Sequence, residues 1–248
     1  MTLAADALPE WTRQSPYRVR FDWGHTGTSA VAADHVVVVD VLRFTTAVDA
    51  AVGRGASVYP FRWKDASAAG FARQVAAVLA DGSDPAGPSL SPVRLSRLRP
   101  GDRVVLPSPN GSTCAAIAAE SGATVLAACL RNAGSVAEWL NGKDGTVGVV
   151  ACGERWPDGS LRPSLEDYLG AAAVIAGLAG PRSPEAEAAA ALWSASDASA
   201  ERLVRSCASG RELEARGWAD DLDFACEIGA SRSVPVLHDG AFVDALHA

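Results

Sequence analysis

The run HVVVVDV at residues 35–41 is the feature that most restricts how this chain can fold. Its four consecutive valines do not alternate with polar residues, so both faces of the segment need apolar cover, as in the interior strands of a parallel sheet. Four further segments, which start at residues 56, 102, 123 and 146, also begin with a strand pattern and continue as a helix. This alternation predicts an α/β fold with three α/β/α layers and a largely parallel, mixed sheet.

The sequence also predicts how the chain is divided. Residues 1–16 are expected to form an N-terminal arm, and residues 17–248 a single α/β domain that opens with an edge strand in YRVRFDWG. The stretch DGSDPAGPS is the most linker-like part of the chain. Two α/β lobes joined near residues 81–92 are therefore an open alternative.

Three other segments have a recognisable pattern. Residues 65–80 are rich in alanine and are predicted to form one helix after the strand at 56–61. Residues 183–220 are rich in Ala, Glu and Arg and are predicted to be helical. The segment SVPVLHDGAF at 233–242 is predicted to form a closing strand and turn.

Composition excludes several classes of protein. The chain has 248 residues and is 48% hydrophobic, enough for a large core, and its net charge of -7 gives no electrostatic basis for binding nucleic acid or an anionic membrane. The five cysteines are odd in number and form no CxxC pair, which argues against a disulfide framework and a structural zinc site. The start MTLAADALPEWTRQ lacks the pattern of a signal peptide, and no apolar run reaches the roughly 18 to 20 residues of a membrane span. We therefore expect a soluble, cytoplasmic protein.

The fold class indicates where a ligand would bind. In open parallel sheets, ligands lie outside the carboxyl ends of the strands, where the strand-to-helix loops gather. Four polar loops fit this position: DVLRFTT (40–46), PSPNGST (107–113), CLRNAGS (129–135) and GERWPDGSLRPS (153–164).

The loop DVLRFTT combines an acid, a base and two hydroxyls at the start of a predicted helix. Free N–H groups at a helix start and a bidentate clamp from Arg43 both suit a phosphate. Asp40 could ligate a divalent metal, act as a base or attack phosphorus. The simpler alternative is that Thr45 or Thr46 caps the helix while Asp40 pairs with Arg43.

The next two loops offer polar backbone and amide groups. Asn110 and Gly111 permit positive φ angles that turn backbone N–H groups inward, and Ser112 follows at the helix start. An isolated Asn-Gly pair also forms an ordinary tight turn. Asn132 in the third loop is typical of a helix cap.

The fourth loop and the helix after it hold the densest charge. Asp167 has a cap-like spacing from Ser164, so stabilisation of the helix start is its alternative role. Glu154 follows a strand end without such a partner and is the better candidate for a metal ligand. Carboxylates without nearby histidines favour Mg²⁺ over zinc. The four histidines show no metal-binding spacing, and His25 alone, in the Gly-rich WGHTGT, is expected beside the site.

Known signatures narrow the chemistry further. The chain has no GxxxxGK[ST] of a P-loop enzyme, no GxGxxG after a strand and no GxSxG elbow. Cys129 and Cys152 lie just inside predicted strand ends and are expected to be small core residues.

Five motifs in order resemble the 2-phosphosulfolactate phosphatase (ComB) family: VVVDVLRFTTAV, PSPNGS, a strand with C-x-x-N, GERW-PDGSLRPSLEDYLGA, and DLDFAC…SVPVLHDG. The resemblance spans about residues 17 to 242. It implies an α/β fold of the family's own type, Mg²⁺ dependence, and hydrolysis of 2-phospho-3-sulfolactate to 3-sulfolactate and phosphate, a step of coenzyme M biosynthesis.

The resemblance also implies site residues, position by position. The expected catalytic residues are Asp40, Arg43 and Glu154. The expected phosphate-binding residues are Thr45, Thr46, Asn110, Gly111, Ser112, Asn132 and Arg162. The expected metal ligands are Asp40, Glu154, Glu166, Asp167 and Asp223, and in ADDLD the neighbours Asp220 and Asp221 compete with Asp223.

The leading hypothesis is thus a Mg²⁺-dependent phosphomonoesterase that acts on a small anionic substrate. The alternatives are a phosphatase for another small phosphorylated acid, and a protein that binds phosphate or sulfonate in the same pocket without turnover. Several carboxylates would weaken anion binding unless a metal neutralises them, which favours catalysis. A covalent aspartyl-phosphate, direct attack by water, and a homodimer all stay open.

Overall fold

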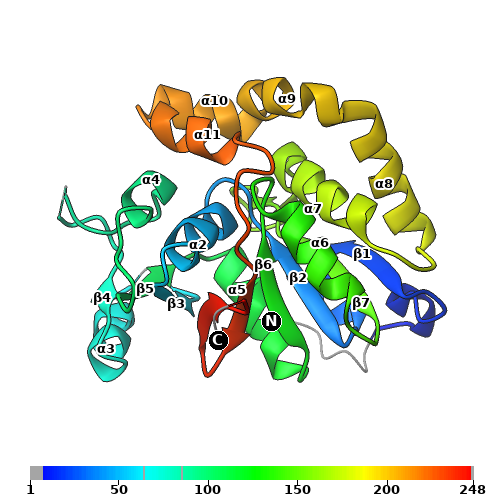
Figure 1. Ribbon diagram of the computed structural model, residues 1–248, viewed down its shortest axis with the longest axis horizontal. Helices are drawn as coiled ribbons and strands as arrows, with labels where there is room; N and C mark the ends of the chain where they lie inside the picture. Colours follow the sequence, from blue (N-terminus) through cyan, green and yellow to red (C-terminus); the bar gives the residue numbers. More distant parts are fainter. Residues whose placement is uncertain (1–7, 64, 85, 247–248) are drawn as a thin grey trace.

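The computed structural model describes residues 8–63, 65–84 and 86–246. Residues 1–7 of the predicted N-terminal arm lie outside the described residues, and the arm's later part holds a short 3₁₀ helix, η2 (Glu10–Arg13). Figure 1 shows one central sheet with helices on both faces, which confirms the predicted three-layer α/β/α architecture. Within the described residues, none of the helices is long and apolar enough to cross a membrane.

Among the described residues, nine strands form one mixed sheet in the order β1-β7-β2-β6-β10-β11-β3-β5-β4. Its first part is a group of four parallel strands: β1 (Val19–Trp23), β7 (Val147–Ala151), β2 (His35–Val39) and β6 (Thr124–Ala128). A second parallel group holds β3 (Ser57–Phe61), β5 (Arg103–Pro107) and β4 (Val78–Leu79). The antiparallel hairpin β10 (Pro235–His238) and β11 (Ala241–Asp244) lies between β6 and β3 and joins the two groups.

Helices cover both faces of this sheet. One face carries α6 (Ala133–Asn141), α7 (Leu165–Gly177) and α8 (Pro184–Ser196). The other carries α1 (Gly24–Val31), α2 (Phe44–Val52), α4 (Pro92–Leu95) and α5 (Gly111–Glu120). A further helix, α3 (Ser67–Gln74), packs on β4 and β5.

The valine run forms β2, and its burial explains the missing alternation. Val37 and Val39 pack in the core under α6 and α7, whereas Val36 and Val38 pack in the core under α1, α2 and α5. All four side chains are at most 1% exposed. Both faces of the strand are therefore apolar because both are covered.

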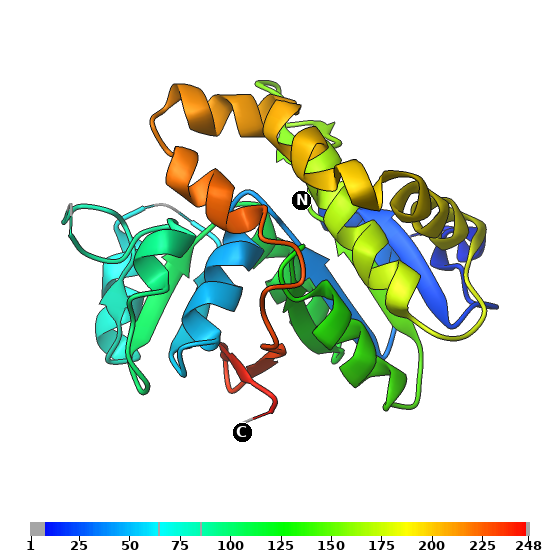
Figure 2. The same cartoon turned by 45° about the horizontal axis from the view of Figure 1, so that its top comes forward.

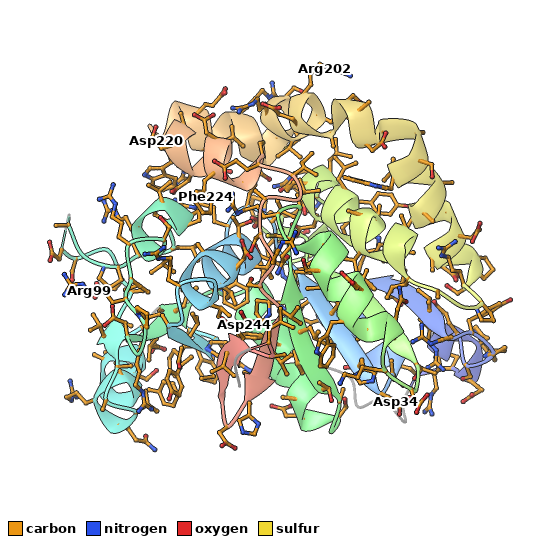
Figure 3. All side chains as sticks on the ribbon, in the orientation of Figure 1. Asp34, Arg99, Arg202, Asp220, Phe224 and Asp244 are labelled. Atoms are coloured by element: carbon orange, nitrogen blue, oxygen red, sulfur yellow. The ribbon has the colours of Figure 1, made fainter. Side chains whose placement is uncertain are left out.

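Four α-helices after α7 form an arm: α8 runs along the face of the sheet, and α9 (Ala200–Ser206), α10 (Ala208–Ala215) and α11 (Ala219–Ala225) continue over its carboxyl edge. Figures 1 and 2 show the arm as an arc from yellow to orange. The arm begins at a capped helix start, because the Ser183 hydroxyl accepts a hydrogen bond from Ala186 N–H at 3.1 Å and Pro184 occupies the first turn. Asp34, just before β2, lies at the opposite edge (Figure 3).

One local prediction was wrong. The helix predicted at residues 65–80 ends at Gln74, and Val78–Leu79 forms β4 instead. The break lies at Ala76, whose φ of 50 cannot continue a helix, and a short apolar run such as VAAVLA does not distinguish helix from strand by its periodicity. The Gly-rich segment that holds His25 lies in α1, which begins directly after β1.

Candidate active site

Four carboxylates from separate parts of the chain gather at the carboxyl edge of the first parallel group. Asp40 follows β2, Glu154 follows β7, and Glu166 and Asp167 lie in the first turn of α7. Like-charge repulsion raises three pKa values in this group: that of Asp40 through Glu154 and Glu166, that of Glu154 through Glu166, and that of Asp167 through Asp40 and Glu166. We refer to Asp40, Glu154, Glu166 and Asp167 as the carboxylate cluster.

Asp40 lies between the starts of two helices. Its Oδ1 accepts a hydrogen bond from Phe44 N–H at 3.2 Å, at the start of α2, and its Oδ2 accepts one from Gly111 N–H at 3.0 Å, at the start of α5. Burial raises the pKa of Asp40 to about 7, and the charge of Glu154 adds to the rise, while these two N–H groups lower it. The helix N–H groups predicted to receive phosphate are thus used, at these two positions, to hold Asp40.

Gly111 is required at this point by close approach, not by its φ angle. A Cβ atom at this position would lie 2.2 Å from Phe44 Cδ1 and 2.8 Å from Asp40 Oδ2. Real Cβ atoms do not approach ring or carboxylate atoms so closely, so only glycine lets the start of α5 reach Asp40.

Asp167 joins two loops of the site. Its Oδ1 accepts a hydrogen bond from Val41 N–H at 2.7 Å, and its Oδ2 accepts from Gly153 N–H at 2.9 Å and from the Ser164 hydroxyl at 2.9 Å. Burial raises its pKa well above the ordinary range, and the charge of Asp40 raises it further. Its contacts with the loops after β2 and β7 extend beyond the helix start that the sequence suggested.

Glu154 is held by a short hairpin and by an amide. Strands β8 (Glu154–Arg155) and β9 (Leu161–Arg162) pair so that Glu154 stands opposite Arg162. Asn110 Nδ2 donates to Glu154 Oε2 at 3.0 Å. Burial raises the pKa of Glu154, the charge of Glu166 raises it further, and the Arg162 guanidinium lowers it.

The arm contacts the site through the start of α10. The Cys207 thiol, at the start of α10, lies 3.2 Å from Glu166 Oε2 and donates to it, and Glu166 is only 2% exposed. Arg162 donates to the Ser209 hydroxyl at 3.2 Å. Two residues of the α10 start therefore contact the cluster and its hairpin.

Arg43 has a different partner from the one that the sequence suggested. Its guanidinium donates to Asp221 Oδ2 at 2.6 Å and stacks on the Trp218 ring at 4.1 Å from the centroid. The Ser91 hydroxyl donates to the other oxygen of Asp221. The alternative in which Arg43 pairs with Asp40 is therefore wrong, since α11 supplies the carboxylate.

The hydroxyls of the first two loops bond to the backbone of their own loops. The Thr45 hydroxyl donates to the Asp40 carbonyl at 2.8 Å, and the Thr46 hydroxyl donates to the Val41 carbonyl at 2.7 Å. The Ser112 hydroxyl donates to the Leu106 carbonyl at 3.3 Å. All three side chains are fully buried, so in this arrangement they stabilise the loop conformations.

Asn132 belongs to a polar network behind the site, most of which sequence reasoning missed. Its Oδ1 accepts from Cys129 N–H at 2.8 Å, and its Nδ2 donates to the Ser233 carbonyl at 3.3 Å. Beside it, Arg131 donates to buried Asp49 at 3.0 Å. This network ties the segment after α11 to α2 and to the loop after β6; Figure 3 labels Phe224, whose ring lies 3.8 Å from the Arg131 guanidinium.

Asp223 lies apart from the carboxylate cluster. Its side chain is 60% exposed and pairs with Arg205 at 2.6 Å. Asp221, two residues earlier on α11, is the member of ADDLD that turns inward. The structure therefore contradicts the expected grouping of Asp223 with the other metal ligands, and α11 points this carboxylate away.

His25 lies beside the loop that carries Asn110. Burial lowers the pKa of His25 to about 4, and the nearby positive charge of Arg155 lowers it further. Its buried Nε2 has no hydrogen-bond partner among the described residues. The ring is therefore neutral at physiological pH, and its place in WGHTGT was the sequence signal for it.

A cleft of about 990 Å³ flanks the site, lined by Arg43, Pro107, Trp218 and Asp221 among others. Asp40 and Glu154 do not line it. Arg43, three residues after Asp40, lines the cleft, and its ion pair with Asp221 forms part of the cleft wall.

The carboxylate cluster fits Mg²⁺ only if other ligands complete the coordination shell of the ion. Within the described ranges, no three Asp, Glu, His or Cys side chains are arranged to hold a metal ion by themselves. Mg²⁺ is usually bound by one or two carboxylates and completes its shell with water and substrate phosphate oxygens. Asp40, Glu154 and Glu166 supply hard oxygen donors whose mutual repulsion a divalent cation would relieve. The donor set therefore suits Mg²⁺ held jointly with a phosphorylated substrate.

Comparison with known proteins identifies the family of the chain. No curated protein matches the chain. The family model described as 2-phosphosulpholactate phosphatase matches residues 25–240, which include every member of the carboxylate cluster. The chain therefore belongs to the 2-phosphosulpholactate phosphatase family and is a phosphatase.

Proposed function

We propose that this protein hydrolyses 2-phospho-3-sulfolactate to 3-sulfolactate and phosphate in a Mg²⁺-dependent reaction, the coenzyme M biosynthesis step for which the family is named. This substrate carries a phosphate, a carboxylate and a sulfonate on three carbons. It therefore needs a site with several positive groups and little apolar surface.

One observation carries the proposal: Asp40 is buried between two helix starts, within charge range of Glu154 and Glu166. Three carboxylates at such a point repel one another and repel any phosphate. A bound divalent cation would reverse this, because it attracts both the carboxylates and the phosphate oxygens. An acidic cluster in a phosphatase is thus best explained by a cation.

In the proposed mechanism, the protein's own residues position the reactants. One or two of Asp40, Glu154 and Glu166 would hold Mg²⁺ together with water and substrate oxygens, and the ion would neutralise charge on the phosphate oxygens when bound. Asp221 takes one of the five N–H donors of Arg43 and Trp218 fixes the guanidinium plane, so further donors remain for an anionic group of the substrate. Across the cluster, Arg162 would contact a second anionic group.

The burial of the cluster also serves the reaction. The arm limits water around Asp40 and Glu166, and charge interactions are stronger where water is excluded. Asp40 and Asp167 are fixed by backbone N–H donors, so the cluster does not need to reorganise as charge develops.

The test is phosphate release from 2-phospho-3-sulfolactate and from a panel of other small phosphate esters, with Mg²⁺ and with EDTA. We expect release that depends on Mg²⁺ and is fastest with the sulfolactate ester. Faster release from an ester without a sulfonate would contradict the substrate, and full activity in EDTA would contradict the metal.

Arg43→Ala should lower kcat/KM by about 10²-fold or more, as loss of a charge-stabilising donor does. Arg205→Ala is the matched control, because Arg205 also pairs with an aspartate of α11 at 2.6 Å but on the exposed side. Equal activities of the two variants would remove Arg43 from the site.

A further inference from the structure

A second cavity, of about 520 Å³, lies outside the catalytic site, between η2, β1, α7 and α8. Tyr168 of α7 lines it, and this residue directly follows Asp167 of the carboxylate cluster. Asp167 contacts the loops after β2 and β7, whereas Tyr168 packs against β1. The cavity is therefore separated from the cluster by the first turn of α7.

Aromatic rings form much of its wall. Trp23 and Tyr168 lie with ring centroids 5.4 Å apart and planes tilted by 56°, and Phe21 stacks on Tyr168 at 5.4 Å. Trp11 on η2 adds a fourth ring and is 83% exposed, unusual for such a large apolar side chain. The negative faces of aromatic rings attract cations.

The charges in the cavity are negative. Asp22 and Glu185 both line it, and no Lys, Arg or His is among the described residues that do. Asp22 accepts a hydrogen bond from Trp23 N–H at 2.7 Å, and no described basic side chain forms an ion pair with Asp22 or Glu185. Burial raises the pKa of Asp22, and the charge of Glu185 raises it further. Within the part of the chain that the structure describes, two acidic residues and no basic residue thus line this space beside the rings.

We propose that this cavity binds a small organic cation of the alkylammonium class. Aromatic rings with a nearby carboxylate are the arrangement that recognises such ions, because the rings contact the alkyl groups while the carboxylates balance the charge. An inorganic cation gains little from ring faces and keeps its water. Catalysis as described above does not involve this site, so its ligand is additional to the phosphatase substrate.

The test is calorimetric titration of the full chain with choline, and separately with 3,3-dimethylbutan-1-ol, which has the same shape without the charge. We expect saturable binding of choline and at least tenfold weaker binding of the neutral alcohol. Equal affinity for the two compounds, displacement of choline by an equal concentration of K⁺, or no choline binding at millimolar concentrations would each overturn the proposal.

Three variants locate the site. Glu185→Gln removes one charge on the exposed side of α8, and Trp11→Ala removes an exposed ring, so both should fold and both should weaken choline binding by about tenfold. Glu187→Gln is the matched control on the same helix, since Glu187 pairs with Arg182 at 3.6 Å and does not line the cavity. Choline binding that is equally strong in all three variants would place the ligand elsewhere.

Discussion

Replacing Asp40 by asparagine should change how the stability of the protein depends on pH. Asp40 is 7% exposed, and burial together with Glu154 raises its pKa to about 7. In the unfolded chain the same group titrates near its ordinary value of about 3.9. Between these two pH values the folded protein binds a proton that the unfolded chain has lost, so stability falls as pH rises.

The magnitude follows from the shift of the pKa. A displacement from 3.8 to about 7 corresponds to about 4 kcal/mol, of which about 3 kcal/mol is lost between pH 4.5 and pH 8. Asparagine carries no such dependence. The NH₂ group of the asparagine would face one of the two N–H donors, Phe44 or Gly111, in place of an acceptor oxygen. The free-energy cost of this lost hydrogen bond is the same at every pH.

His25 has the opposite effect on stability and must be separated from Asp40. Its pKa is lowered to about 4, so the unfolded chain binds the extra proton and stability rises as pH increases from about 4 to about 6.5. This contribution is present in both proteins. The quantity to compare is therefore the difference in unfolding free energy between wild type and Asp40→Asn, in which His25 cancels.

The assay is urea unfolding of both proteins in EDTA at several pH values from 4.5 to 8. We expect the variant to gain about 3 kcal/mol relative to wild type across this range. If Asp40 holds Mg²⁺ as proposed, added Mg²⁺ should stabilise wild type more than the variant at pH 8, because an ion that binds the folded protein through Asp40 favours the folded state. Turnover of the variant should fall by about 10². If the difference in unfolding free energy between the two proteins stays constant within about 1 kcal/mol from pH 4.5 to pH 8, the pKa of Asp40 is not raised as described.

Three further predictions concern its neighbours. Glu154→Gln keeps the acceptor for Asn110 but removes a charge, so the Mg²⁺ concentration for half-maximal activity should rise about tenfold while the melting temperature stays close to wild type; an unchanged Mg²⁺ titration would contradict this. Gly111→Ala should cost about 1–3 kcal/mol in urea unfolding because of its contacts with Phe44 and Asp40, whereas Gly134→Ala, at the start of α6 with open space around it, should be neutral or slightly stabilising. Asp221→Asn should cost about 3 kcal/mol and lower kcat/KM, whereas Asp223→Asn on the exposed side of α11 should change stability by at most about 1 kcal/mol; equal effects would contradict the inward role of Asp221.

The parallel part of the fold and the core of the site could be predicted from the sequence for the same reason. Unbroken runs such as residues 36–39 identify strands covered on both faces, and parallel strands bring their carboxyl ends to one edge. Asp40 follows β2, and Glu154 follows β7. Their side chains come close together when β2 and β7 are neighbours in the sheet, as they are.

Other features depend on information that no local pattern contains. Arg43 and Asp221 are 178 positions apart, and the choice among three aspartates depends on how α11 is rotated against α2 and α4. The Thr45 and Thr46 hydroxyls suit phosphate by type, but the backbone of their own loop turns both of them inward. The hairpin β10–β11 resembles any short antiparallel pair, and nothing in its residues indicates that it separates two parallel groups.

The arm of α8–α11 contacts Glu166, Arg162 and Arg43, and the buried network behind it explains how the arm is held. Asp49 accepts hydrogen bonds from Arg131, Ser231 and Ser233, so the segment after α11 is fixed to α2, whose start holds Asp40. A polar side chain as buried as Asp49 needs such hydrogen-bond partners, so the segment cannot shift without leaving Asp49 unsatisfied at a large cost. The other end of the arm is bonded to β1, where Ser183 N–H donates to the Val19 carbonyl at 2.9 Å, and with both ends held the arm keeps Asp221 against Arg43. The positions of the side chains at the carboxyl edge of the sheet therefore depend on residues near position 230 as much as on those near position 40.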